Sequence, residues 1–363
     1  MTEATSNQLN LPTIGSQQIA LLEKLCNACA VSGDEGEIRA IVMEEVKPFA
    51  DSVKEDALGN ILAIRHARTA NPLRVMLDAH MDEVGFMLVD SEGEGLFRFD
   101  IVGGVDPRQL VGKTVLVGKD HVSGIIGAKP IHLTTADERS RAIPLESLRI
   151  DVGPGSNGKV KVGDRATFAT HFQQVGPSLI AKALDNRLGV AILIELLKNP
   201  PAEIELLVSF SVQEEIGLRG ARVAAYALKP DLAFAIDSTP ANDLPMWDGS
   251  ENSKYNTRLG GGPAIYIADS ATLSDPRLIR FLAQTADELS IPCQFRQPGG
   301  GGTDGGAIHK VHSGVPTVSV SVPGRYAHTA ALVSRISDWE YTLQLMDAAL
   351  RRLTPQVIAG DRK

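Results

Sequence analysis

Two adjacent carboxylates follow one of the most apolar stretches of the chain. Leu206 to Val212 is apolar apart from two serines, as expected of a strand covered on both faces, and Glu214 and Glu215 come just after it. Adjacent residues of an extended chain point in opposite directions, so one acid can bind a metal while the other faces a substrate. Taken alone, the two acids could equally be solvated loop residues.

Further candidate ligands lie at the ends of other predicted elements. They are His80 and Asp82, Asp237 and His328, which follow buried strands, and Asp185, which lies at the start of an apolar helix. If these strands are parallel, their carboxyl ends meet at one edge of a sheet. Imidazole and carboxylate groups suit borderline divalent cations such as Zn²⁺, Co²⁺ or Mn²⁺. Five separate segments with this chemistry argue against chance and favour a metal centre.

Composition limits the function classes. The chain of 363 residues carries a net charge of −8 without a Lys/Arg-rich run, which argues against nucleic-acid binding. The polar start does not resemble a secretion signal, and no apolar run approaches the ~20 residues of a membrane span. Three cysteines fit a reducing compartment, so we expect a cytoplasmic protein that does not bind membranes. Cys26 and Cys29 lie inside a helical pattern, and we interpret both as core residues.

The pattern of elements predicts an α/β protein with an insertion. Residues 1–86 and 176–363 alternate apolar strands with amphipathic helices, which predicts a mixed central sheet flanked by helices. Residues 87–175 instead contain short strands separated by Gly, Asp and Pro turns, with one short helix predicted near 142–148. We therefore expect a small β-rich domain inserted into a catalytic α/β domain.

Six short sequence segments carry a resemblance to a known family. They are Ala79–Phe86, Lys182–Arg187, Val212–Ala221, Ala235–Thr239, Gly300–Asp304 and Arg325–Thr329. The chain resembles the co-catalytic di-metal aminopeptidases, and more narrowly the glutamyl, leucyl and deblocking aminopeptidases that assemble as tetrahedral dodecamers. This resemblance implies a zinc-peptidase-like catalytic domain. The chain departs from the family pattern at Asn186, where Asp is frequent, and at Ser238, where Val is frequent.

The resemblance implies a role for each candidate residue. Asp185 would bridge two divalent metal ions, with His80 and Asp237 completing one site and Glu215 and His328 completing the other. A water shared by the two cations would be the nucleophile. Glu214 would act as the general base, and Asp82 would accept the ring N–H of His80 and so fix its tautomer.

The resemblance also implies self-association and a substrate class. The inserted domain, residues 87–175, would mediate dimers and through them a dodecamer, and short peptides would be the substrates. The preferred amino-terminal residue stays open. The glycine-rich segment Gly299–Asp304 could line the substrate pocket or form a close-packed turn, and no role follows for His132.

Two other readings remain. A glycoside hydrolase could use Glu214 and Asp82 as its carboxylate pair, and members of the resembling family have carried a cellulase label. That reading leaves the two histidines and Asp185 unexplained, and the chain is only 5% aromatic, with Trp247 and Trp339 as its only tryptophans. A catalytically silent scaffold would be expected to lack at least one ligand, whereas all five are present.

Overall fold

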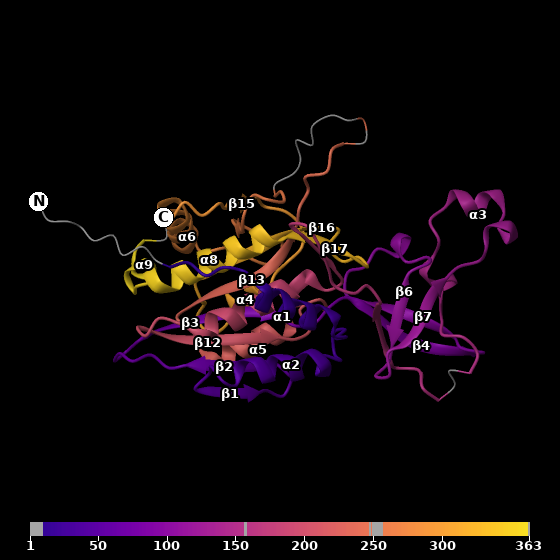
Figure 1. Cartoon of the computed structure of the whole chain (residues 1–363), viewed down its shortest axis with the longest axis horizontal. Helices are drawn as coiled ribbons and strands as arrows, with labels where there is room; N and C mark the ends of the chain where they lie inside the picture. The colour runs from indigo at the N-terminus through magenta and orange to yellow at the C-terminus, as the bar shows by residue number, and fades with distance from the viewer. Residues whose placement is uncertain (1–9, 156–157, 247, 249–256, 362–363) are drawn as a thin grey trace, which may run out of the picture.

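The computed structural model describes residues 10–155, 158–246, 248 and 257–361. It consists of an α/β body and a small β-barrel that stands beside it (Figure 1). Trp247 lies outside the described residues. No helix among the described residues is long and apolar enough to cross a membrane.

The body is built on a mixed sheet of eleven strands in the described part of the chain. Its hydrogen-bonded path runs β1 (Ser52–Glu55), β2 (Ile61–Arg65), β12 (Ile204–Ser211), β3 (Leu73–His80), β13 (Leu232–Pro240), β16 (Thr317–Arg325), β17 (Leu332–Arg335), β11 (Ser178–Ala181) and β10 (Gln173–Val175). Strands β14 (Ala264–Tyr266) and β15 (Gln294–Arg296) extend from β16. The four neighbours β12, β3, β13 and β16 are parallel to one another, so their carboxyl ends lie on the same edge.

Helices cover both faces of this sheet. On one face, α4 (Leu184–Lys198) contacts β3 and β13 and is joined by α1 (Ser16–Asn27), α2 (Gly36–Val46) and α8 (Ile336–Arg352). On the other face, α5 (Arg219–Leu228) contacts β12 and β3, and the short α7 (Gly305–Ile308) contacts β13 and β16. Helix α6 (Pro276–Glu288) packs on α8 and on the terminal α9 (Gln356–Ala359).

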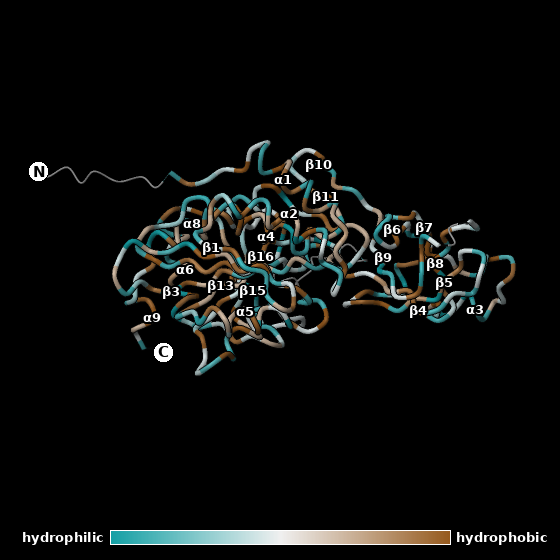
Figure 2. Tube along the Cα trace, turned by 90° about the horizontal axis from the view of Figure 1, so that it is seen from below, coloured by the Kyte–Doolittle hydropathy of each residue, from teal (hydrophilic) through white to brown (hydrophobic). Residues whose placement is uncertain are grey.

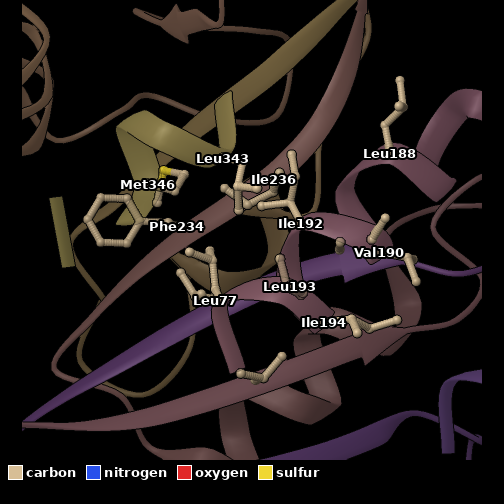
Figure 3. Close-up of a cluster of buried hydrophobic side chains, with 14 of the residues drawn as sticks. Leu77, Leu188, Val190, Ile192, Leu193, Ile194, Phe234, Ile236, Leu343 and Met346 are labelled. Atoms are coloured by element: carbon tan, nitrogen blue, oxygen red, sulfur yellow. The ribbon is translucent and has the colours of Figure 1, made fainter. Parts of the chain in front are cut away.

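The buried strands divide their side chains between these two faces. In β3, Val75 and Leu77 belong to the large core with α4, whereas Met76 packs with the alanines of α5. The same alternation places Phe234 and Ile236 of β13 against α4 and α8, where Leu193 and Met346 complete the layer (Figure 3). Burial on both faces explains why these strands read as nearly continuous apolar runs in the sequence.

The insertion forms a closed barrel with a core of its own. Its strands are ordered β4 (Gly85–Gly93), β5 (Leu96–Val102), β8 (Arg149–Asp151), β7 (Val122–Gly127), β6 (Thr114–Val117) and β9 (Arg165–Phe168). Phe86 lies edge-on to Phe99 and Phe168 at the centre of this core. The hydropathy-coloured trace shows the barrel as a separate body with hydrophobic stretches of its own (Figure 2). The sequence-based expectation of a mixed sheet with helices and an inserted β-rich unit is confirmed.

One local prediction in the insertion is wrong. The helix expected near 142–148 is only a single 3₁₀ turn at Leu145–Ser147, and the helix in this region is α3 (Ala136–Ser140). Thr135 and Glu138 form a reciprocal capping box at its start, in which each side chain accepts a main-chain N–H of the other residue. That Ser/Thr-x-x-Glu spacing was available in the sequence and marks the helix start.

Candidate metal centre

The five ligands expected from the sequence meet at the carboxyl edge of the four parallel strands. His80 is the last residue of β3, Asp237 lies within β13, Asp185 is in the first turn of α4, Glu215 lies in the turn after β12, and His328 lies in the loop after β16. All five line one cavity. Parallel pairing of β12, β3, β13 and β16 thus brings together residues that are far apart in the chain.

Asp185 lies at the centre of the five. Its Oδ1 is 3.4 Å from Nε2 of His80, and its Oδ2 is 3.6 Å from Nε2 of His328. Nε2 of His80 is also 3.4 Å from Oδ1 of Asp237, and Nε2 of His328 is 3.4 Å from Oε2 of Glu215. The five side chains therefore form two groups, each with one imidazole and two carboxylates, that share Asp185.

Burial and mutual repulsion perturb the acids of this cluster. Burial, reinforced by the charge of Asp185, raises the pKa of Glu215 to about 8. Burial likewise raises the pKa of Asp237 to about 6, although its hydrogen bond with His80 opposes the effect. Without a cation, these carboxylates cannot all be ionised cheaply at neutral pH.

The residues present fit a pair of divalent cations. Among the ion pairs of the described residues, no lysine or arginine pairs with any of the five side chains, and the three carboxylates face only the two imidazoles. Ligand atoms of His80, Asp185 and Glu215 lie within 4.8 Å of one another. A set of imidazoles and carboxylates with no thiolate suits Zn²⁺, Co²⁺ or Mn²⁺.

Glu214 and Glu215 are oriented differently from the sequence-based argument. Strand β12 ends at Ser211, and the two acids lie in a tight turn in which the N–H groups of Gly217 and Leu218 donate to the carbonyl of Glu214. Gln213 enters this turn with a φ of +58°. The turn, and not an extended strand, therefore presents both acids to the cavity. Burial and the neighbouring acids raise the pKa of Glu214 well above its usual range.

Asp82 holds this turn in place. Its Oδ1 accepts the main-chain N–H of Glu214 at 3.0 Å, and its Oδ2 accepts that of Glu215 at 3.2 Å. The hydroxyl of Ser32 donates to Oδ2 at 2.6 Å. Nδ1 of His80 lies 3.5 Å from the Asp82 carboxylate and 3.2 Å from the main-chain oxygen of Asp82, so the backbone is its nearer acceptor. The carboxylate is fully buried and makes more contacts than the sequence indicated.

Further residues that support the site were not identified from the sequence. The main-chain oxygen of Gly104 lies 2.9 Å from Nδ1 of His328, which directs Nε2 toward Asp185. Next to the site, Lys182 donates to both oxygens of Glu83, and Thr167 of the barrel donates to the same carboxylate. Lys182 and Glu83 lie within the segments that carry the family resemblance, but their pairing joins positions 99 residues apart and gives no local signal.

The structure explains why asparagine stands at position 186, where the resembling family frequently has aspartate. Its Nδ2 donates to the carbonyl of Ile236 at 2.7 Å, and its Oδ1 accepts the main-chain N–H of Gly189 at 3.1 Å. An ionised aspartate could not donate to that carbonyl. Asn186 therefore ties the start of α4 to β13 beside Asp237. Ser238 lines the cavity, and against the effect of burial its hydroxyl, together with the two histidines, helps to hold the pKa of Asp185 below its usual value. The valine that is frequent at this position in the family has no hydroxyl to do so.

The cavity has a volume of about 710 Å³. Besides the acids and histidines it is lined by Tyr266, Arg296 and residues 300–302 of the glycine-rich segment. Arg296 stacks on the ring of Tyr266 and donates to the carbonyl of Gly300, which holds the segment against the cavity wall. The glycines thus line the cavity, whereas Thr303 and Asp304 are buried behind it. His132 lies on an exposed turn of the barrel domain, Ile131–Leu133, and does not line the cavity.

One known protein family matches most of the chain. The family described as M42 glutamyl aminopeptidase matches residues 59–345. A putative aminopeptidase from Acetivibrio thermocellus is 34% identical over 335 residues, which span 91% of this chain and 97% of that protein.

Solved structures agree with this assignment. An aminopeptidase from the archaeon Desulfurococcus kamchatkensis superposes with a TM-score of 0.88 at 33% identity, covering 94% of this chain and 96% of its own. A TET1 peptidase from Pyrococcus horikoshii, described as assembling into a tetrahedron or a large octahedral shell, has a TM-score of 0.80 at 33% identity, with 93% and 100% covered. A Thermotoga maritima protein with this fold is described as an endoglucanase; its TM-score is 0.73 at 30% identity, with 90% and 95% covered.

The family match covers well over half of the chain, and the relatives are aligned over nearly their whole length. The matched region contains the five ligands expected from the sequence, together with Asp82 and Glu214. The chain therefore belongs to the M42 glutamyl aminopeptidase family and is a metal-dependent hydrolase of peptide bonds.

Proposed function

We propose that the chain is an aminopeptidase that uses two divalent cations, bound on either side of Asp185. His80 and Asp237 would hold one cation, and Glu215 and His328 would hold the other. The observation that carries this proposal is the position of Asp185, whose two oxygens face the two different histidines at 3.4 and 3.6 Å. When bound, such a pair of cations acidifies water and polarises a carbonyl.

Glu214 is the proposed general base. It lines the cavity beside the ligands but is not in the nearest contacts of either histidine. In the crowded acid cluster its pKa is raised, so it holds a proton more readily than an exposed glutamate does. It would take a proton from the attacking water and return it to the leaving amine.

The substrates we propose are short peptides. The cavity of about 710 Å³ is lined by the acid cluster and by Tyr266, Arg296 and residues 300–302, and it has room for an amino-terminal residue. Zn²⁺, Co²⁺ and Mn²⁺ all suit the donor set. The low cysteine count and the absence of a disulfide among the three free cysteines agree with the proposed cytoplasmic location.

Self-association through the barrel domain is also part of the proposal. The related TET1 peptidase of Pyrococcus horikoshii is described as forming closed shells. In this chain the barrel domain, for which we proposed the bounds 87–175, exposes Ile131 by 73% and Leu133 by 60%. Exposed apolar side chains grouped on one turn favour a protein interface. Dimers through this domain, and a dodecamer built from them, would restrict access to short peptides.

The glycoside hydrolase alternative meets a specific obstacle. Asp82, the partner that this reading gives to Glu214, is fully buried and already accepts three hydrogen bonds. A carboxylate engaged in this way is not free to protonate or attack a glycosidic bond. It serves better as a support for the turn that carries Glu214 and Glu215.

A paired assay separates the two activities. The enzyme is supplied with Zn²⁺, Co²⁺ or Mn²⁺ and tested on aminoacyl anilides of Glu, Leu, Lys and Ala, and in parallel on a cellulose oligomer. We expect anilide hydrolysis that a chelator abolishes and no action on the oligosaccharide. No hydrolysis of any anilide with any of the metals would remove the aminopeptidase proposal.

A further inference from the structure

A second group of potential metal ligands lies between the α/β body and the barrel. Cys29 follows α1, Glu37 is in the first turn of α2, and His121 lies in the turn between β6 and β7. Their ligand atoms lie within 4.8 Å of one another. We refer to these three residues as the Cys29 cluster. None of them lines the cavity of the catalytic centre.

The carboxylate of Glu37 holds the cluster together. Its Oε2 accepts the main-chain N–H of Cys29 at 3.1 Å and lies 3.0 Å from Nε2 of His121. The side chains of His121 and Glu37 are 39% and 41% exposed, so a solvated ion can reach them. Cys29 is only partly buried, unlike Cys26, which corrects the interpretation of both cysteines as core residues.

The three donors of the Cys29 cluster match the ligand chemistry of zinc sites in proteins. Sulfur, imidazole nitrogen and carboxylate oxygen are the three ligand types that Zn²⁺ takes from proteins. Zn–S and Zn–N bonds of about 2.3 and 2.0–2.1 Å place neighbouring tetrahedral ligands roughly 3.4–3.6 Å apart. The spread of the Cys29 cluster, from 3.0 Å to at most 4.8 Å, is close enough that small side-chain rotations reach this spacing.

We propose that Cys29, Glu37 and His121 bind one zinc ion that joins the barrel to the α/β body, with water in the fourth position. This site is separate from the catalytic centre and goes beyond the proposed function. Two of its ligands belong to the body and one to the barrel, so occupancy would restrict movement between them. The barrel side of the protein also supplies Gly104, whose carbonyl orients His328, so this junction borders the catalytic centre.

Zinc uptake at this site has a proton balance that can be measured. Burial raises the pKa of the Cys29 thiol to about 11, so the thiol carries its proton at neutral pH. Formation of the Zn–S bond therefore releases one proton to solvent for each ion bound, with no change in oxidation state. The proton release and the loss of the free thiol are two readouts that do not depend on catalysis.

Metal counting in matched variants tests the site. Full-length wild type, Cys29→Ser and His121→Ala are compared with Cys293→Ser, which removes a half-buried thiol elsewhere. Each protein is stripped of metal with a chelator, reloaded with a small excess of Zn²⁺ and desalted. Its zinc content is then measured by elemental analysis. Because the catalytic centre also takes up metal, the difference from wild type is the readout. We expect one ion fewer per chain in the first two variants, one proton fewer released on loading, and no change in the control.

Thiol labelling gives a measurement on the unaltered protein, which guards against a variant that fails to fold. Alkylation of Cys29, read by peptide mass, should slow at least tenfold after zinc loading, whereas alkylation of Cys293 should not change. Equal metal content in wild type and Cys29→Ser would overturn the proposal. Zinc-independent alkylation of Cys29 would overturn it as well, since it would leave only the contact between His121 and Glu37.

Discussion

The carboxylate of Asp82 accepts the main-chain N–H of Glu214 at 3.0 Å, and this contact helps to fix the turn that presents Glu214 and Glu215 to the cavity. The neighbouring oxygen does the same for the next residue, Glu215. A residue that sequence reasoning assigned to the tautomer of His80 therefore also positions the proposed base and one proposed metal ligand. Both roles depend on a fully ionised acceptor, and hydrogen bonds together with the charge of His80 hold the pKa of Asp82 low against the effect of burial.

Asp82→Asn tests this positioning role. Asparagine keeps the shape but turns an N–H group toward donors that need an acceptor, so the turn should shift. We expect kcat/KM to fall roughly 10–100-fold, the usual cost of losing a supporting residue of this kind. Ser32→Ala is the matched control, because it removes one donor and leaves both main-chain contacts intact. Equal losses in the two variants would contradict a role in holding the turn.

The two adjacent acids should differ in their effect on metal content. Glu214→Gln should retain metal while turnover falls about 10²–10⁴-fold, the span typical of a general base. Glu215→Gln should lose metal, because its Oε2 lies 3.4 Å from Nε2 of His328 in one of the two ligand groups. The metal content and the initial rate of both variants are measured on the same preparations, by elemental analysis and by peptide hydrolysis. Metal loss in Glu214→Gln with retention in Glu215→Gln would mean that the roles are reversed.

The metal-free enzyme should become less stable as pH rises. Burial raises the pKa of Asp237 to about 6 and that of Glu215 to about 8, so the folded state binds protons that the unfolded state releases. Such groups stabilise the fold below their unfolded pKa, and this stability is lost as pH rises through the folded pKa. We expect Tm of the chelated enzyme to fall between pH 5 and pH 8.5.

Metal should remove this pH dependence, because cations compensate the ionised carboxylates. The control is the same melting series with Zn²⁺ present, in which Tm should stay level or rise over the interval. A chelated enzyme whose Tm is constant or rises with pH would contradict the account of the acid cluster.

The exposed turn Ile131–Leu133 is expected to lie in the interface through which the chain self-associates. Replacing Ile131 and Leu133 by glutamate should shift the protein toward the 38.8 kDa monomer in light scattering, because charge would be buried in the proposed interface. Leu273→Glu is the control, since Leu273 is 68% exposed on the α/β body. A wild type that is monomeric at micromolar concentration yet cleaves short peptides would contradict the assembly proposal and leave the catalytic one standing.

The parts of the site that could be predicted from sequence are those that depend on buried parallel strands. The runs ending at His80 and reaching Asp237 are apolar because helices cover both faces of the sheet. This pattern identified them as buried strands and so predicted that their carboxyl ends lie at the same edge of the sheet. A tight loop at Gly217 and Gly220 is indicated by the sequence, but the orientation of Glu214 and Glu215 within it could not be predicted, since the φ of +58° at Gln213 leaves no mark in residue type. The Gly104–His328 contact joins residues 224 positions apart and depends on how the barrel docks.

The barrel illustrates a different limit. Its longer strands follow the alternation of apolar residues and turns, but β8 has three residues, Arg149–Asp151, of which only Ile150 is buried. So short a strand has no periodicity to detect, and its pairing with β5 and β7 is a property of the closed barrel.

Asp185 is proposed to serve two cations at once, and metal titration of the chelated enzyme tests this bridging role most directly. Wild type should take up two ions per chain in the catalytic centre and gain activity on an aminoacyl anilide as they bind. Cys29→Ser provides the background for counting, so that only the catalytic centre contributes. In that background Asp185→Ala should lose both ions and all activity. Retention of one tightly bound ion by Asp185→Ala, or full activity with a single ion in the parent, would contradict the bridging role.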